Sequence, residues 1–318
     1  MFRYIGTFII LTVLGILYEK YKLKFVPDEE LEKYDLIKKY LLNSNENLGG
    51  KPILWVHTTH NINARHWLNF GSRNTLQLNQ PYILSCIETI VRHCSDSFHI
   101  CLIDDNSFMK LIPHWDIDVP SLAEPVRSHI RALAMSKLLL HYGGMVIPDS
   151  TIVLSDLNNL YESHIGKGMF VGETLNRNVT STYCALEMDN YLMGCVKEDK
   201  NMKKFSNYLE LLVSRDYTNE IEFEGNISNF LNKMYNKGEI LKVDGSYFGQ
   251  KDESDKDVTI DRLMGNSYIH FKSNMVGIII PQKMLLKRQK YGWFVRLSQN
   301  QLKHCDNIVA KWLIIGQN

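Results

Sequence analysis

Two apolar runs of the sequence end in side chains that could bind a ligand. Thr58 follows the run 52–57. Asp104 and Asp105 follow the run 98–103. Short apolar runs of this kind predict buried β-strands. Because the carboxyl ends of parallel strands meet at one edge of a sheet, where ligands bind, we expect Thr58, Asp104 and Asp105 to line one cleft.

The two aspartates allow two interpretations. Their carboxylates could bind a ribose or a divalent metal, since hard oxygen ligands suit such ions. The polar stretch 104–106 is equally typical of an ordinary turn at the end of a strand. The sequence leaves both interpretations open.

The element between these runs predicts a parallel sheet. Residues 81–93 place Ile83, Ile87 and Ile90 at helical spacing. The order strand, helix, strand implies parallel neighbours joined by a right-handed crossover. We therefore expect an α/β fold with a central, mostly parallel sheet over residues 51–318.

A third strand that ends in a carboxylate follows a long predicted helix. Residues 121–124, SLAE, match a capping box, which predicts the start of this helix. Apolar side chains then recur at steps of three and four, and Gly143 and Gly144 can adopt the positive φ that ends a helix. Residues 145–147 are a short apolar strand, and Asp149 lies just after it.

The composition excludes several classes of protein. The 318 residues carry 36 Lys plus Arg against 35 Asp plus Glu, a net charge of +1. A dedicated nucleic-acid binder carries a clear basic surplus, so we expect no nucleic-acid partner. The six cysteines form no C-x-x-C pair and are too few for a disulfide scaffold. The sequence has no glycine-rich phosphate loop, H-E-x-x-H or G-x-S-x-G, so nothing favours a kinase, a metalloprotease or an α/β-hydrolase.

The N-terminal segment predicts membrane attachment. Residues 4–18 are uncharged and apolar, and a helix of this length would measure about 22 Å against a hydrocarbon core of about 30 Å. Flanking Lys and Tyr side chains can extend the span, and no small-x-small cleavage site follows, so we favour a single-pass anchor over a signal peptide. The orientation stays open, because the lysines after the run favour a cytosolic domain and the sequons at Asn178 and Asn226 favour the opposite side. The predicted division is a membrane anchor over 1–25, a stem helix and linker over 26–50, and one domain over 51–318.

The segment 135–151, MSKLLLHYGGMVIPDST, resembles the nucleotide-sugar glycosyltransferases of the DxD type. The similarity is to the capsular-polysaccharide-synthesis-protein and sugar-binding-region families, which read S-D-x-x-R…L-L-x-x-Y-G-G-x-W-x-D-x-T/D in this region. Further similarity lies in residues 51–56, 80–93, 101–106 and 268–271. The resemblance covers residues 51–160 best.

This resemblance implies a GT-A type Rossmann-like fold and a hexosyltransferase activity. A sugar would pass from a nucleotide-sugar donor to a glycan or protein acceptor. In such families an acidic motif holds Mn²⁺ or Mg²⁺, which neutralises the leaving diphosphate. By the same resemblance His270 is a late metal ligand, and a hydrogen-bonded core histidine is the competing interpretation.

The DxD motif is degenerate in this chain. Pro148 stands where the first motif aspartate is expected, and one inserted residue places Asp149 on it as the candidate metal ligand. The helix also lacks the family's Ser-Asp-x-x-Arg. Arg127 and Arg131, one turn apart, could supply positive charge to a phosphate from a shifted position, or could be the solvated flank of an amphipathic helix. The donor-binding candidates are Thr58, Asp104, Asp105, Arg127 and Arg131.

The sequence identifies no catalytic base or nucleophile. Glu173 and Asp189 are weaker candidates, for an acceptor contact and a base. His57 and His60 have the spacing of metal ligands only on a helix, and the residues that follow suggest a loop.

Three hypotheses follow. The first is a membrane-anchored glycosyltransferase. The second is a catalytically degenerate relative with a binding or structural role. The third is an unrelated Rossmann-like membrane protein.

Overall fold

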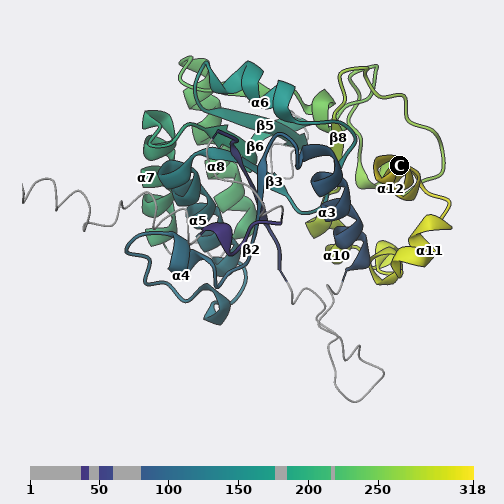
Figure 1. The fold of residues 1–318 in the computed structure, drawn as a ribbon, viewed down its shortest axis with the longest axis horizontal. Coiled ribbons are helices and arrows are strands. Elements are labelled where there is room, and N and C mark those ends of the chain that lie inside the picture. Colours follow the sequence, from purple (N-terminus) through teal and green to yellow (C-terminus); the bar gives the residue numbers. More distant parts are fainter. Residues whose placement is uncertain (1–36, 43–49, 60–79, 176–184, 216–218) are drawn as a thin grey trace, which may run out of the picture. The chain divides into compact units, whose positions relative to one another are not determined.

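The computed structural model describes residues 37–42, 50–59, 80–175, 185–215 and 219–318 (Figure 1). The chain divides into two compact units, Met1–Tyr40 and Leu41–Asn318. In the first unit, the Tyr40 amide donates a hydrogen bond of 2.9 Å to the Ile37 carbonyl. The predicted membrane anchor over 1–25 lies outside the described residues. Within the part of the chain that the structure describes, no helix is both long and apolar enough to span a membrane.

The second unit is built on a six-stranded sheet of order β2-β1-β3-β6-β5-β7. Its parallel pairs are β1 with β2, β1 with β3 and β5 with β7, and β6 runs antiparallel to both β3 and β5. The predicted α/β fold with a mostly parallel central sheet is therefore confirmed. The strands are β1 Ile53–His57, β2 His99–Ile103, β3 Gly144–Pro148, β5 Phe170–Leu175, β6 Leu186–Cys195 and β7 Leu241–Val243, with β4 Thr151–Val153 and β8 Gly277–Ile279 as a separate pair.

Helices flank the sheet, with α5 and α7 on one side and α3, α11 and α12 on the other (Figure 1). The α-helices are α3 Pro81–Cys94, α4 Phe108–Leu111, α5 Val126–Tyr142, α6 Asn158–Ile165, α7 Lys200–Ser214, α8 Glu220–Asn236, α9 Ile260–Leu263, α10 Gln282–Lys287, α11 Gln299–Lys303 and α12 Ile308–Gln317. Short 3₁₀ turns occupy η1 Val119–Ser121, η3 Gly245–Phe248, η4 Gln289–Tyr291 and η5 Phe294–Arg296.

The central strands are apolar because both faces of the sheet are covered. In β1, the side chains of residues 53–56 are all buried, which is typical of a strand inside a parallel sheet. Trp55 is fully buried, and its Nε1 donates a hydrogen bond of 2.9 Å to the Gly143 carbonyl at the end of α5. Burial of these side chains fixes β1 between β2 and β3, and with it the position of the strand ends.

The end of α5 depends on glycine. Gly144 has φ +98°, and a Cβ there would lie 2.2 Å from the Ile53 carbonyl oxygen. Only glycine lets the chain turn from the helix into β3 this close to β1. The helix stop predicted at Gly143 and Gly144 is therefore confirmed.

The start of α5 differs from the prediction. The helix begins at Val126, and Ser121 lies in η1, where its hydroxyl bonds the Asp118 carbonyl. Glu124 instead accepts hydrogen bonds from the backbone and hydroxyl of Ser128. The predicted capping box at 121–124 is therefore wrong, because Pro125 intervenes between the SLAE string and the first helical turn.

The stem and linker predicted over 26–50 include residues that already pair with the sheet. Leu41 bridges Cys101 in antiparallel fashion, and the Leu42 amide donates a hydrogen bond of 3.0 Å to the Ile100 carbonyl. The second unit therefore begins at Leu41, ahead of the predicted boundary at residue 51.

Candidate functional site

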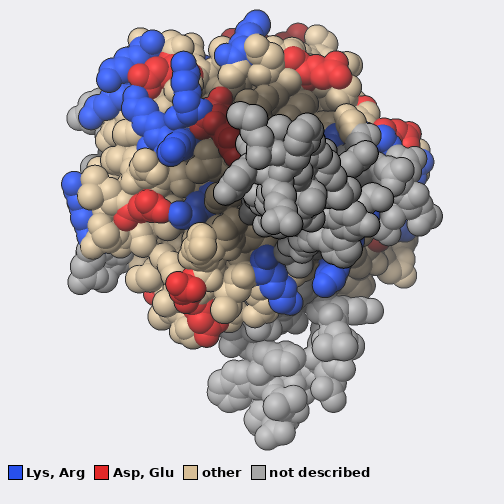
Figure 2. Space-filling model, turned by 60° about the vertical axis from the view of Figure 1, so that its left-hand side comes forward, with Lys and Arg blue, Asp and Glu red and all other residues tan. Residues whose placement is uncertain are grey.

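A pocket of about 640 Å³ opens at the carboxyl ends of β1, β2 and β3. One wall consists of these strand ends and the first turns of α5, and the other consists of β6, α8 and α10. The strand-end wall includes six residues predicted from the sequence: Thr58, Asp104, Asp105, Arg127, Arg131 and Asp149. Figure 2 shows acidic side chains set back in a hollow, on a face that otherwise carries both signs of charge.

Asp105 is held in place by two neighbours. Arg131 donates two hydrogen bonds to it, from Nε to Oδ1 and from Nη2 to Oδ2, both 2.7 Å long. His57 Nε2 lies 3.0 Å from Oδ1 on the other side. Burial alone would raise the pKa of Asp105, but the hydrogen bonds from Arg131 and His57 outweigh it and keep this pKa well below its usual range. Asp105 is thus a permanent carboxylate whose oxygens already have partners.

Asp104 is the residue that forms an ordinary turn at the end of its strand, as one of the two interpretations predicted. Its Oδ1 accepts a hydrogen bond of 3.0 Å from the Ser107 amide and one of 2.6 Å from the Ser107 hydroxyl. This carboxylate therefore closes the turn that leads into α4, although it also lines the pocket.

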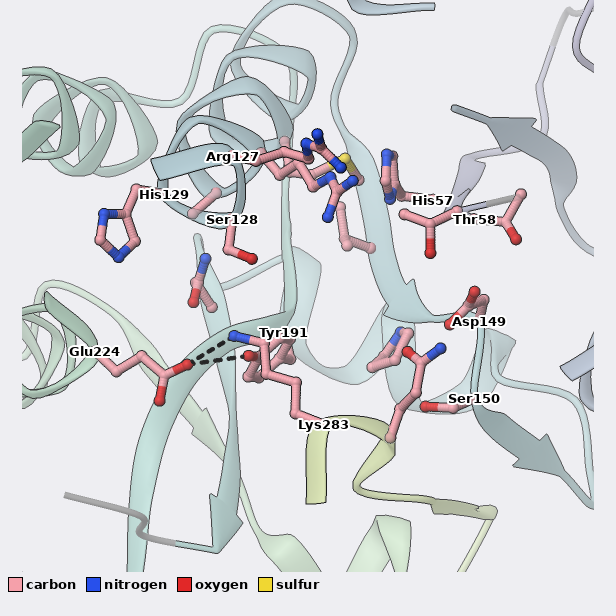
Figure 3. Close-up of a pocket in the computed structure, with 18 of the residues that line it drawn as sticks. His57, Thr58, Arg127, Ser128, His129, Asp149, Ser150, Tyr191, Glu224 and Lys283 are labelled. Atoms are coloured by element: carbon pink, nitrogen blue, oxygen red, sulfur yellow. Dashed lines mark hydrogen bonds and ion pairs between the residues drawn. The ribbon is translucent and has the colours of Figure 1, made fainter. Parts of the chain in front are cut away.

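Asp149 has a different environment. It is 6% exposed and lies at the end of β3 beside Thr58 (Figure 3). Burial raises the pKa of Asp149 to about 7, although the Thr58 hydroxyl, nearby backbone amides and the charge of Arg131 act in the opposite direction. The Thr58 hydroxyl is itself buried and makes no well-aligned hydrogen bond among the described residues. Asp149 is thus a buried carboxyl that can hold or release a proton near neutral pH.

Arg127 brings positive charge to the mouth of the pocket. Its guanidinium donates hydrogen bonds to two backbone carbonyls, from Nε to Leu122 at 2.7 Å and from Nη2 to Pro120 at 3.1 Å. Within the described ranges it forms no ion pair, so its charge is available to an anionic ligand, whereas the charge of Arg131 is engaged by Asp105.

The opposite wall carries a cluster that the sequence did not reveal, the Lys283 cluster, made of Lys283, Glu220, Glu224 and Tyr191. Lys283 Nζ donates hydrogen bonds of 2.8 Å to Oε1 of both glutamates. The Tyr191 hydroxyl donates one of 3.3 Å to Glu224 (Figure 3). Burial would lower the pKa of Lys283, but Tyr191 and the two glutamates outweigh it and raise this pKa. The only trace in the sequence is the i, i+4 spacing of the glutamates, which puts them on one face of a helix.

Two further side chains on the pocket wall have a buried polar atom that makes no hydrogen bond to the described residues. His129 is 4% exposed, stacks on Phe223 with ring centroids 3.7 Å apart, and has no hydrogen bond at Nε2 in the described structure. Burial and the nearby charge of Lys283 lower the pKa of His129, so its ring is neutral at pH 7. Thr174 is also 4% exposed, and its hydroxyl has no partner among the described side chains and backbone. Unpaired buried polar atoms are costly, so their position on a pocket wall points to a polar ligand.

The remaining candidates do not reach the pocket. His270 is exposed, contacts the ring of Tyr268 at 4.8 Å and is not part of the pocket wall. Glu173, on β5, pairs with Lys242 of β7 at 3.0 Å and with Lys251 at 2.6 Å, and it is not part of the pocket wall. Asp189 is buried on β6 opposite Gly172, outside the pocket wall. His60 lies outside the described residues.

Within the part of the chain that the structure describes, no group of three His, Cys, Asp or Glu side chains is placed to hold a metal ion. Asp105 is committed to Arg131 and His57, and Asp149 lies beside a threonine rather than a second carboxylate. Binding of Mn²⁺ or Mg²⁺ therefore stays a prediction from the resemblance, with Asp149 as the candidate ligand that the shifted motif places on the pocket wall.

Comparison with models of known protein families gives no match. A search among curated proteins likewise finds none that matches.

Proposed function

We propose that this protein is a glycosyltransferase of the hexosyltransferase type, which moves a sugar from a nucleotide-sugar donor to a glycan or protein acceptor. The observation that carries the proposal is Asp149, a buried carboxyl whose pKa is raised to about 7, in a pocket at the ends of parallel strands. The resemblance of residues 135–151 to DxD-type glycosyltransferases supports the same function, with a GT-A type fold as the finer description of this domain.

The charge distribution of the strand-end wall suits the donor. The guanidinium of Arg127 is a cation available to a diphosphate, while Arg131 and Asp105 form a fixed pair beside it. Thr58, buried without a well-aligned hydrogen bond, can donate to a phosphate or ribose oxygen.

Asp149 supplies the proton chemistry in this proposal. During transfer, the acceptor oxygen bonds to the anomeric carbon of the donor sugar while the bond from that carbon to the phosphate oxygen breaks. The electron pair leaves with the nucleotide, and the acceptor's hydroxyl proton goes to the Asp149 carboxylate. A base with a pKa near the working pH is well matched to this task.

Donor turnover tests the proposal. The full chain, in detergent, is incubated with UDP-, GDP- and CMP-sugars, with and without Mn²⁺, and released nucleotide is measured. We expect release from one donor class by the wild type and by Asp116→Asn, an exposed aspartate outside the pocket, and none by Asp149→Asn. Equal release by the Asp149 and Asp116 variants would contradict the proposed role.

A catalytically degenerate protein with a binding role is the second candidate. Two observations favour it. Pro148 occupies the position of the first aspartate of the DxD motif, and the Asp105 carboxylate is engaged in an ion pair with Arg131. Under this alternative the pocket binds a nucleotide sugar without turning it over, so binding and release together distinguish the two.

Membrane attachment through residues 1–25 belongs to the same proposal. The apolar segment 4–18 supports it. We expect the full chain to stay in the membrane pellet after alkaline carbonate washing. Recovery of the full chain in the washed supernatant would contradict the anchor.

A further inference from the structure

The pocket continues beyond Asp149 to the end of β5. Strand β6 runs antiparallel to both β3 and β5, so β3 and β5 point in the same direction and their carboxyl ends lie at the same edge of the sheet. Thr174 is near the carboxyl end of β5, and it lines the pocket together with Thr58 at the end of β1. The strand order β1-β3-β6-β5 therefore places Asp149 between Thr58 and Thr174.

The separation of the two threonines sets a minimum length for the ligand. Three strand spacings separate β1 from β5, which corresponds to about 14 Å at ~4.8 Å per strand. Both hydroxyls are buried and make no well-aligned hydrogen bond to the described residues. A ligand that pairs with both hydroxyls is therefore longer than one phosphate group or one sugar ring.

The β5 end of the pocket is lined by uncharged side chains. They come from residues 174–175 of β5, from Gln250 after η3 and from residues 279–282 between β8 and α10. Hydrogen bonds hold the last of these segments beside Asp149. The Ser150 hydroxyl donates to the Ile280 carbonyl at 2.8 Å, and the Ile280 amide donates to the Ser150 carbonyl at 3.0 Å.

Three side chains at this end have hydrogen-bonding capacity left over, and we call them the β5-end cluster: Thr174, Gln250 and Gln282. Gln250 Nε2 donates to two backbone carbonyls, at 3.2 and 3.3 Å, which fixes the amide and leaves its Oε1 without a hydrogen bond among the described residues. Gln282 Nε2 is buried and likewise makes no hydrogen bond to them. The cluster thus offers an acceptor, a donor and a hydroxyl, without a formal charge.

We propose that the β5-end cluster binds the sugar of the donor, and that this sugar is uncharged. This inference rests on the proposed function, because it places the diphosphate of the same donor molecule at Thr58 and Arg127. The anomeric carbon then lies near Asp149, between the two ends, where the proton of the acceptor is taken up. Hydroxyl groups of a hexose both donate and accept hydrogen bonds, so they can satisfy all three members of the cluster.

The uncharged character of the cluster sets the specificity. A carboxylate on the sugar would leave water without a cation of the cluster to pair with. Lys283, which follows Gln282 in the sequence, already donates hydrogen bonds to two glutamates. Because transfer of an unpaired carboxylate from water into a buried site is costly, the cluster favours neutral hexoses and N-acetylhexosamines over uronic and sialic acids.

Binding of bare nucleotides and of their sugar conjugates tests this inference. The full chain in detergent is titrated calorimetrically with UDP, GDP and CMP, with the neutral conjugates UDP-glucose, UDP-N-acetylglucosamine and GDP-mannose, and with the acidic conjugates UDP-glucuronate, GDP-mannuronate and CMP-sialate. We expect a neutral conjugate to bind about tenfold more tightly than its own nucleotide, because the sugar adds several hydrogen bonds. The acidic conjugate of that nucleotide should bind no more tightly than the nucleotide itself.

Two variants remove single hydrogen-bonding groups from the cluster. Thr174→Val should reduce the affinity gained from the sugar about fivefold and leave the affinity for the bare nucleotide unchanged. This variant should fold, because valine has the shape of threonine and the removed hydroxyl has no partner among the described residues. Gln282→Met should have the same effect on binding. Thr259→Val and Gln289→Met make the same exchanges outside the pocket wall and should leave both affinities unchanged.

The outcomes separate this inference from the proposed function. If a nucleotide binds but its neutral conjugate binds no more tightly, or if Thr174→Val and Gln282→Met keep the full gain, the sugar site is refuted and the donor role of the pocket remains. A larger gain for the acidic conjugate would refute the preference for an uncharged sugar. Binding of no nucleotide and no conjugate would refute the proposed function, and this inference with it.

Discussion

Asp105 and Asp149 stand at the ends of β2 and β3, on either side of β1, and they differ in almost every property except residue type. Asp105 accepts hydrogen bonds from Arg131 and His57, which keep its pKa low. Asp149 is more deeply buried and has no ion pair among the described residues, and burial raises its pKa to about 7. Two carboxyls on one pocket wall thus divide the roles: Asp105 fixes Arg131, and Asp149 can exchange a proton.

The largest expected effect is that of Asp149→Asn. Transferase activity should fall by a factor of about 10³, since the amide cannot take a proton. Stability should change in the opposite direction. The folded pKa of about 7 exceeds the usual 3.8, so the wild type loses stability as the pH rises between these values, and the loss persists above pH 7.

The Asp149→Asn variant has no carboxyl to ionise at this position, so it does not lose stability as the pH rises. It should be more stable than the wild type at pH 8, by up to ~4 kcal/mol, and should match it near pH 4. Urea unfolding at both pH values measures the difference. A variant less stable than the wild type at pH 8 would mean that Asp149 is ionised and well paired in the folded protein.

Asp105→Asn should destabilise the protein, in contrast to Asp149→Asn. The substitution breaks a mostly buried ion pair and leaves the Arg131 guanidinium without its carboxylate, so we expect the free energy of unfolding to fall by about 3 kcal/mol at pH 7. Because the folded pKa of Asp105 is depressed, its contribution is present above about pH 4 and fades as the pH falls below that value. Unfolding curves from pH 3 to pH 8 check this, and a pH-independent difference would contradict the ion-pair explanation.

Lys283→Met tests the second wall. Two glutamates would lose their common cation, and we expect a stability loss of about 2 kcal/mol. Because Lys283 lowers the pKa of His129 and the glutamates raise it, the variant should titrate His129 at a higher pH. NMR titration of the His129 ring measures this, with Lys204→Met as the exposed control. An unchanged His129 titration would show that the two groups are not coupled.

The smallest stability effect should come from Arg127→Gln. The Arg127 guanidinium donates hydrogen bonds to two backbone carbonyls at the pocket mouth, so the free energy of unfolding should fall by about 1 kcal/mol in the variant. Nucleotide affinity should nevertheless fall about tenfold, because this is the cation available to a phosphate. Calorimetry with the preferred nucleotide checks the affinity, and equal affinity in wild type and variant would remove Arg127 from the donor site.

The strand-end wall was predictable, and the opposite wall was not. Short apolar runs and helical spacing indicated β1, α3 and β2, and the rule that ligands gather at strand ends brought Thr58 and Asp105 to one pocket. Asp105 and Arg131 are 26 positions apart in the sequence, so no local sequence pattern predicts that their side chains pair. The contact of Lys283 with Glu224 spans 59 positions and joins two helices, so only the folded chain reveals it.

The likeness of residues 268–271 to a late histidine strand predicts a metal ligand at His270. The structure places this side chain at the surface, and it is not among the residues that line the pocket. Residues 135–151, by contrast, lie in α5 and β3 and place Asp149 on the wall itself. The motif at 135–151 located a pocket residue because it includes a strand of the central sheet, whose carboxyl end lies at the pocket.

Nucleotide binding to the full chain is the most direct test of the central claim that this pocket holds a nucleotide sugar. Thermal unfolding in detergent would be followed against UDP, GDP, CMP and their sugar conjugates, with and without Mn²⁺, in the wild type and in Arg127→Gln. We expect one nucleotide class to raise the midpoint in the wild type and to raise it less in the variant, because a ligand that binds only the folded state stabilises it. A well-folded wild type whose midpoint responds to none of these ligands would contradict the claim.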